Sequence, residues 1–223
     1  SPPGVARVVV QDISFTLQAG QGLGVIGPSG SGKSTLARLL VGASHPVRGK
    51  VRLDGASLDQ WAPEELGKHV GYLPQDIELL PGTVGQNIAR FEPEADSNAV
   101  IAAAKAVGAH DLILGLPAGY ETLIGKDGAG LSTGQAQRVA LARAVYKNPF
   151  LVVLDEPNSH LDAEGDDALT RAIAGIRERK GIVIVIAHRP SAIVAVDTVL
   201  FLNQGRMQAL GPKDEVLSKV LQR

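Results

Sequence analysis

The stretch that most limits what this chain can fold into is GPSGSGKST, at residues 27–35. It follows an apolar strand-like run, LGVIG, and leads into GKSTLARLLVG, whose leucines recur with helical spacing. Glycines let successive backbone N–H groups converge on one phosphate, the lysine adds a positive charge, and the following serine can reach Mg²⁺. A flexible Gly/Ser turn is the alternative, which the flanking strand and helix disfavour. The predicted nucleotide-binding residues are Gly27, Pro28, Ser29, Gly30, Ser31, Gly32, Lys33, Ser34 and Thr35.

Two unbroken apolar runs, FLVVLD at 150–155 and GIVIVIAH at 181–188, predict strands buried on both faces of a parallel sheet. The segment between them, AEGDDALTRAIAGIRERK, has the spacing of an amphipathic helix that connects parallel strands. Other strands are expected at 5–10, 13–17, 23–27, 49–55 and 69–75, followed late in the chain by a hairpin around 203–205 and a helix over 213–222.

From about residue 84 to 146 the pattern changes to Ala/Leu-rich segments of helical period, without strand signals. We therefore predict an α/β fold with a parallel-sheet core, an antiparallel β subdomain and an inserted helical subdomain. The core and β subdomain are expected at 1–75 and 148–223, and the helical subdomain at 76–147.

Composition excludes several classes of protein. The net charge is −1 and no Lys/Arg block occurs, which argues against nucleic acid as the main partner. The absence of cysteine excludes a disulfide scaffold and a thiolate metal site. No apolar run approaches the roughly 18 residues that a membrane helix needs. We expect a soluble body, and the missing initiator methionine favours a fragment of a longer protein.

Polar residues at the expected strand ends are candidate catalytic and metal-binding groups. Asp155 ends a buried strand, where it can hold the Mg²⁺ shell, and Glu156 can polarise a water for attack on a γ-phosphate. His188 follows the neighbouring strand and could reach the same phosphate, while Gln75 could orient a water or complete the metal shell. The candidate metal ligands are thus Ser34, Gln75 and Asp155. Taken singly, the acidic pair could be a helix N-cap, His188 a surface residue and Gln75 a turn residue.

A second anion site is expected at GLSTGQAQR, residues 130–138. Ser132, the Gly134 amide and a helix N-terminus can hold an anion. By itself, the spacing from Ser132 to Gln135 is also that of a capping box, which needs no ligand.

In their order along the chain, the phosphate loop, Gln75, LSTGQ, LVVLDEP, NSHLD and His188 resemble the ATP-binding-cassette (ABC) ATPases. The resemblance implies a P-loop NTPase (RecA-like) core and hydrolysis of Mg-ATP, with Glu156, His188 and Gln75 as catalytic residues. It identifies Ser132, Thr133, Gly134 and Gln135 as the signature that closes over the γ-phosphate on a second subunit, and Asp162 as the acid of the D-loop. Two head-to-tail copies would then share two ATP molecules.

The segments PPG, LDGASLDQW, EELGKHVGYLPQD and DEPNSHLD are similar to those of bacterial type I secretion ATPases, which export proteases and other proteins. ETLIGKDGAG, at 121–130, resembles the exporter segment that touches transmembrane coupling helices. This resemblance implies a transmembrane domain in the same chain, a membrane fusion protein, an outer-membrane channel and a place at the cytoplasmic face of the bacterial inner membrane.

The chain departs from the family pattern at two points. Thr133 stands where glycine is usual, and its β-branched side chain predicts crowding of the partner's nucleotide and slow turnover. Residues 1–14 hold no aromatic residue to stack on adenine, which leaves base selectivity open. A catalytically weak regulatory or binding module, a soluble cassette of translation or DNA repair, and an importer cassette on a separate chain are the alternatives.

Overall fold

The computed structural model describes residues 9–125, 130–188 and 193–221. The elements follow the chain as β1 Gly22–Ile26, α1 Lys33–Leu40, β2 Arg52–Leu53, β3 Ala56–Ser57, η1 Leu58–Gln60, α2 Pro63–His69, β4 Val70–Leu73, β5 Gly82–Thr83, α3 Val84–Ile88, α4 Ser97–Ala106, α5 His110–Leu114, η2 Gly119–Glu121, β6 Leu123–Ile124, α6 Thr133–Val145, β7 Leu151–Asp155, α7 Ala163–Glu178, β8 Ile182–Ile186, β9 Thr198–Asn203, β10 Arg206–Pro212 and α8 Lys213–Leu221.

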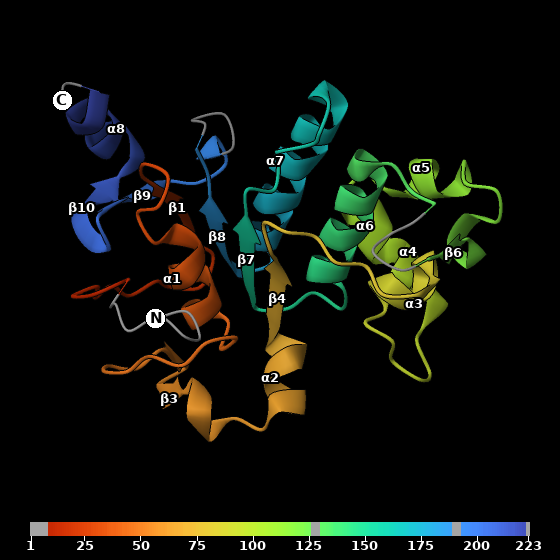
Figure 1. Ribbon diagram of the computed structural model, residues 1–223, viewed down its shortest axis with the longest axis horizontal. Coiled ribbons are helices and arrows are strands. Elements are labelled where there is room, and N and C mark those ends of the chain that lie inside the picture. Colours follow the sequence, from red (N-terminus) through yellow and green to blue (C-terminus); the bar gives the residue numbers. More distant parts are fainter. Residues whose placement is uncertain (1–8, 126–129, 189–192, 222–223) are drawn as a thin grey trace.

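Within the described ranges, six strands form the main sheet in the order β10-β9-β1-β8-β7-β4 (Figure 1). All neighbours are parallel except β9 and β10, which form the expected terminal hairpin. The register pairs Asp155 of β7 with Ile186 of β8, and Ile186 in turn with Val25 of β1. The carboxyl ends of β1, β8 and β7 therefore lie side by side at one edge of the sheet.

Alternate residues of the buried strands supply two hydrophobic cores, one on each face of the sheet. Val153 of β7 and Ile184 of β8 pack with α1 on one face. Val152 and Val183 pack with α6 and α7 on the other. The two-sided burial explains why these strands read as unbroken apolar runs, and the predicted α/β fold is confirmed.

Helices α3–α6 gather beyond the β4 edge of the sheet (Figure 1). Small residues of α4 and α6, such as Ala103, Ala104 and Ala140, pack there with Ile88 and Ile113 in the core that faces β4. The short pair β5–β6 joins residues 82–83 to 123–124 within this region, where the sequence had shown no strand signal. The boundaries predicted for a helical subdomain, 76–147, stay a prediction.

Two of the expected strands are wrong within the described residues. Ile13, Phe15 and Leu17 lie in irregular chain and pack onto the α1-side core, so burial rather than strand pairing explains their apolar alternation. Val9 and Val10 also form no strand, while residues 5–8 lie outside the described part. The expected strand at 49–55 contains only Arg52–Leu53, which pairs with Ala56–Ser57 across a turn at Asp54 and Gly55.

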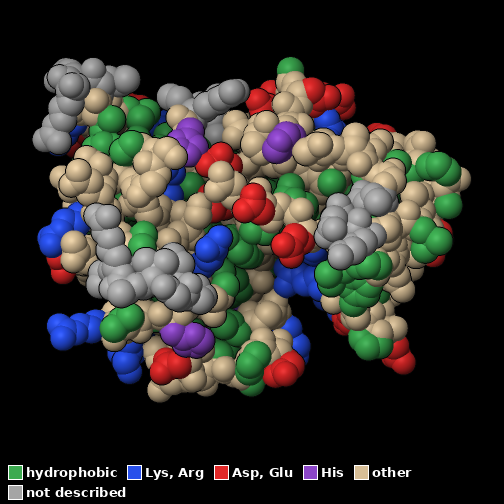
Figure 2. All heavy atoms as spheres, in the orientation of Figure 1, with side chains coloured by type: hydrophobic (Ala, Val, Ile, Leu, Met, Phe, Trp, Pro, Cys, Tyr) green, Lys and Arg blue, Asp and Glu red, His purple; other side chains and the backbone are tan. Residues whose placement is uncertain are grey.

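No helix among the described residues has the length and apolar character required to cross a membrane. On the face in Figure 2, acidic and basic side chains are interspersed rather than gathered into one block. The same view shows a notch along the lower margin, between α2 on one side and α3 on the other.

Candidate nucleotide-binding site

The phosphate loop connects the end of β1 to the start of α1. At Gly27, with φ 156°, a Cβ atom would lie 2.0 Å from the carbonyl oxygen of Leu202, so no other residue fits. Gly32 caps α1 with φ 100°, in the left-handed region that favours glycine. No side chain caps α1, and its first turn holds no acidic residue. The helix N-terminus is therefore free to receive an anion.

Lys33 lies folded back over this loop and is only 5% exposed. Its Nζ donates to the carbonyl oxygens of Gly27 at 2.9 Å and Pro28 at 3.0 Å. Burial lowers the pKa of Lys33, while the carboxylates of Glu156 and Asp155 raise it. The ammonium thus lies within the loop and beside two acidic groups, where a phosphate oxygen could replace the carbonyl partners.

Three oxygen-bearing side chains adjoin the loop, and they are the predicted metal ligands. The Ser34 hydroxyl donates to Gln75 Oε1 at 3.4 Å. Asp155 is 1% exposed, and neither of its carboxylate oxygens has a hydrogen-bond partner. Burial raises the pKa of Asp155, and the charge of Glu156 raises it further, against the opposing effects of Ser34 and Lys33.

These donors fit Mg²⁺, which prefers oxygen ligands and is usually held by one or two carboxylates together with phosphates and water. A cation would also compensate a buried carboxylate that is otherwise unpaired. The described residues contain no cluster of three His, Cys, Asp or Glu side chains able to hold a metal by themselves. One carboxylate, one hydroxyl and one amide oxygen would leave further positions of an Mg²⁺ shell to phosphate oxygens and water.

Glu156 and His188 form a direct pair beside the predicted metal ligands. His188 Nε2 lies 2.8 Å from Glu156 Oε1. Glu156 has φ 52°, and its backbone N–H donates to the carbonyl oxygen of Ile186 at 2.9 Å. This positive φ directs the chain away from β7 while holding the residue against β8.

The predicted catalytic groups thus come from the ends of four adjacent strands. The phosphate loop follows β1, His188 follows β8, Asp155 and Glu156 come at the end of β7, and Gln75 follows β4. Ligands of open α/β sheets bind at this carboxyl edge. The arrangement brings the predicted metal ligands, the acidic Glu156 and His188 to the edge where a phosphate is expected.

The signature residues lie at the start of α6. Ser132 caps this helix through its hydroxyl, which accepts from the Gln135 N–H at 3.3 Å, while Gln135 Oε1 accepts from the Ser132 N–H at 2.8 Å. The capping box expected as the local alternative is therefore present. Within the described part of the chain, no hydrogen bond joins Ser132 or Gly134 to the phosphate loop.

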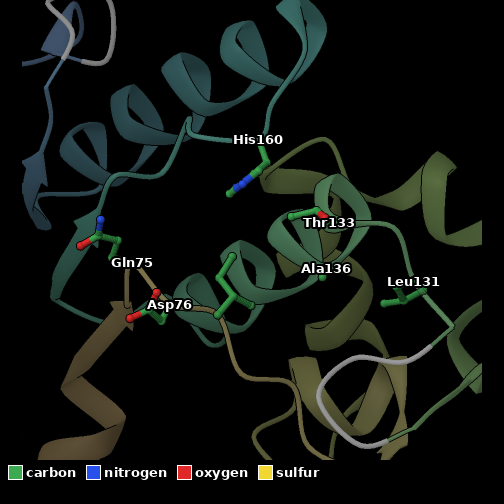
Figure 3. A pocket seen from close by; sticks show the side chains of 7 residues that line it. Gln75, Asp76, Leu131, Thr133, Ala136 and His160 are labelled. Carbon is green, nitrogen blue, oxygen red and sulfur yellow. The ribbon is translucent and has the colours of Figure 1, made fainter.

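Thr133 borders a cavity of about 330 Å³ that lies between α6, the loop after β4 and the loop before α7. His160 projects into this cavity, with Thr133 on one side and Gln75 on the other (Figure 3). The remaining lining residues are Asp76, Ile77, Leu131 and Ala136.

Asp162, the predicted D-loop acid, caps α7. Its Oδ1 accepts from the Gly165 N–H at 2.9 Å and from Arg138 Nη2 at 2.6 Å. The Gly165 N–H lowers the pKa of Asp162, and the charge of Arg138 contributes to the shift. The sequence had suggested no role for Arg138, Gln137 or His160, which connect α6 to this loop. The polar character of Gln137 and Arg138 on an alanine-rich helix was the available signal, and none pointed to His160, which lies in the loop before α7.

One predicted exporter segment, at 121–130, is only partly described. Leu123–Ile124 form β6 and pair with Gly82–Thr83, whereas residues 126–129 lie outside the described residues.

Comparisons with known proteins relate the chain to membrane transporters. A family model described as "ABC transporter" matches residues 10–159. The chain is 63% identical over 220 residues to the type I secretion system ATP-binding protein PrsD of Rhizobium meliloti (strain 1021). The aligned region covers 99% of this chain and 38% of PrsD. The chain is 39% identical over 212 residues to the exotoxin translocation ATP-binding protein PaxB of Pasteurella aerogenes, covering 95% and 30%.

A solved structure, of a bacterial Atm1-family ABC exporter with ATP bound, superposes with a TM-score of 0.87 at 37% identity. It covers 96% of this chain and 37% of that chain. The chain thus spans less than two fifths of the length of each of these three relatives. It belongs to the ABC transporter family.

Proposed function

We propose that this chain is the ATP-hydrolysing domain of an ABC exporter that works as a head-to-tail dimer in type I protein secretion. The observation that carries the proposal is the convergence at one sheet edge of the free helix N-terminus of α1, Lys33, the unpaired buried Asp155 and the Glu156–His188 pair. Substrate positioning and charge stabilisation at such an edge are the main requirements of phosphoryl transfer.

Each group has a defined role in this proposal. The loop amides of residues 27–35 and the Lys33 ammonium bind the β- and γ-phosphates of ATP. Ser34, Gln75 and Asp155 would hold Mg²⁺, whose charge would offset that of the phosphates. Glu156 accepts a proton from the attacking water, and His188, held at 2.8 Å from it, contacts the γ-phosphate. A cation bound there would favour the ionised form of Asp155, against the effect of burial.

The signature supplies the other half of each site in a dimer. Ser132, Thr133, Gly134 and Gln135 begin a 13-residue helix without an acidic residue in its first turn. Its N-terminus suits the γ-phosphate of an ATP that is held by the second copy. Asp162 forms an ion pair with Arg138 of this helix. It would then face the dimer partner.

Transport requires a membrane partner, and the named functions of PrsD and PaxB point to protein export. A hollow of about 430 Å³ beside the loop after β4 is lined by charged Arg38, Asp76 and Glu78 and by Leu80, which is 53% exposed. It would receive a helix from the transmembrane domain of the same transporter. A membrane fusion protein and an outer-membrane channel would complete the system at the cytoplasmic face of the bacterial inner membrane.

The test uses Glu156→Gln, which keeps the shape of the side chain and removes its basicity. We expect ATP binding to persist while phosphate release falls by about 10²–10⁴-fold. Light scattering at saturating Mg-ATP should then detect a stable dimer. The matched control, Lys33→Met, should neither bind ATP nor dimerise. Exclusively monomeric Glu156→Gln protein with nucleotide bound would contradict the proposal.

A catalytically weak cassette that serves as a regulatory module is the second candidate, and Thr133 favours it. The side chain of Thr133 is exposed at the cavity beside the N-terminus of α6, where it could crowd a nucleotide. A phosphate-release assay on the wild-type chain separates the two candidates. Steady ATP turnover would exclude the catalytically weak module. Faster turnover in Thr133→Gly would show that the Thr133 side chain slows hydrolysis.

A further inference from the structure

Gln137, in the second turn of α6, is connected to the loop that follows Glu156. It is 1% exposed, and its Nε2 donates to the carbonyl oxygen of Pro157 at 2.6 Å. Its Oε1 faces the Ser159 hydroxyl at 3.4 Å and His160 Nδ1 at 3.1 Å. One buried amide thus holds three of the four residues directly after the proposed catalytic carboxylate.

The same loop is fixed to α6 at two further points. Arg138 Nη2 pairs with Asp162 Oδ1 at 2.6 Å. A Cβ atom at Gly134 would lie 3.2 Å from the carbonyl oxygen of His160, so the helix approaches the loop backbone closely. The first two turns of α6 and residues 157–162 are therefore expected to move as one unit.

The hydrogen-bond pattern fixes the orientation of the Gln137 amide. The Pro157 carbonyl oxygen can only accept, so the atom of Gln137 beside it is the amide nitrogen. The remaining Oε1 can only accept. His160 Nδ1 lies 3.1 Å from this oxygen and 2.9 Å from the Ser159 hydroxyl, so Nδ1 donates to Oε1 when it carries a hydrogen and otherwise accepts from Ser159. This donor is present in the neutral Nδ1–H tautomer and in the protonated ring alike.

We infer that Gln137 and His160 are positioning residues that transmit the placement of the signature helix to Glu156. Pro157 directly follows Glu156, whose φ of 52° and N–H bond to Ile186 leave its backbone little freedom. A phosphate bound at the N-terminus of α6 would shift the helix, and Gln137 would shift the Pro157 carbonyl and the Glu156 carboxylate with it. This inference rests on the proposed function, since it connects the partner's ATP, bound at α6, to hydrolysis of the ATP that the chain's own phosphate loop holds.

The test compares near-isosteric variants of both residues. Gln137→Glu turns the donor toward Pro157 into an acceptor, and His160→Asp places an acceptor against Gln137 Oε1. His160→Asn retains a donor close to the position of Nδ1 and serves as the matched control. We expect kcat to fall by about tenfold or more in Gln137→Glu and His160→Asp, with KM for ATP within about threefold, and His160→Asn to retain most of the wild-type kcat.

The outcomes separate this inference from the function on which it rests. Absence of Glu156-dependent turnover in the wild-type chain would overturn both. Wild-type turnover together with an unaltered kcat in His160→Asp would overturn the inference alone, as would parallel losses in kcat and ATP affinity. His160 is exposed, so its variants remain informative if buried Gln137→Glu fails to fold.

Discussion

Asp155 illustrates how one residue can be built for a ligand at the expense of the free protein. Its buried carboxylate has no hydrogen-bond partner, and its pKa is raised by that burial. Asp155→Asn removes the charge, so we expect the nucleotide-free protein to gain about 1 kcal/mol, or roughly 2–4 °C in Tm for a chain of this size. Addition of Mg-ATP should stabilise only the wild type. Thermal unfolding with and without Mg-ATP measures both effects.

The control for this prediction is the same substitution at Asp162. That carboxylate accepts from the Gly165 N–H and Arg138, and its pKa is lowered. Asp162→Asn should therefore lower Tm where Asp155→Asn raises it. A lower Tm in nucleotide-free Asp155→Asn would contradict the account of Asp155 as a buried charge that Ser34 and Lys33 compensate only in part.

Tyr146 gives a pH dependence with a definite sign. Burial, together with its hydrogen bond to Glu92 at 3.0 Å, raises the pKa of Tyr146 from 10.0 to about 12. The folded state thus favours the protonated phenol, and this stabilisation is complete below pH 10 and is lost as pH rises toward 12. Urea unfolding of wild type and Tyr146→Phe should show a stability difference at pH 8 that shrinks above pH 10. A difference that is constant across this range would contradict the assignment.

At the scale of elements, sequence patterns predicted the secondary structure of segments whose conformation depends mainly on their own residues. The runs LVVLD and IVIVI became β7 and β8 because both faces of each strand are buried. The apolar alternation in ISFTL led to a wrong strand prediction, because it reflects only that Ile13, Phe15 and Leu17 face a core. The pair β5–β6 could not be foreseen, since two-residue strands about forty positions apart pair through tertiary packing.

The same distinction applies to the candidate site. The phosphate loop, Asp155 and Glu156 could be predicted because each lies in one contiguous motif, next to a strand that sets its direction. The contacts of Gln137 with Pro157 and His160 join two elements, and no spacing within either segment reveals them. The three-dimensional structure was therefore needed to suggest a connection between α6 and residues 157–160.

Arg90 connects the region of α3–α6 to the sheet by capping two helices at once. Its guanidinium donates to the carbonyl oxygens of Gly67 and Val70, at and beyond the end of α2, and to those of Arg143 and Ala144 at the end of α6. Carbonyls in the last turn of a helix lack helical partners. Arg90→Ala should therefore lower the free energy of unfolding by about 2–3 kcal/mol.

Urea denaturation measures that loss, and Arg90→Lys is the control. A single ammonium cannot reach both helix ends, so we expect lysine to recover only part of the stability. A loss within about 0.5 kcal/mol in Arg90→Ala, typical of an ordinary surface position, would contradict the capping role.

For the whole molecule, the proposed function requires two copies of the chain to complete one site. Ser132 lies at a helix N-terminus that no described hydrogen bond joins to the phosphate loop of its own chain, and the structurally similar Atm1-family exporter has ATP bound. Under the proposed head-to-tail arrangement, Lys33 and Glu156 act on the ATP of their own chain, and Ser132 acts on that of the partner. Lesions on opposite sides of the shared site should then complement each other.

Lys33→Met prevents ATP binding at the phosphate loop. Ser132→Asp keeps a good helix cap while its charge repels the γ-phosphate. Each variant alone should be inactive, whereas an equal mixture should recover part of the wild-type activity, because each mixed dimer holds one intact pair of phosphate loop and signature and can close around its one ATP. Phosphate release over a range of mixing ratios measures this recovery. A mixture of Lys33→Met with Glu156→Gln is the control. Lys33 and Glu156 serve the ATP of the same chain, so every site in a mixed dimer carries one of the two substitutions and no intact site can form. Equal activity in the two mixtures would show that the signature serves its own chain's ATP.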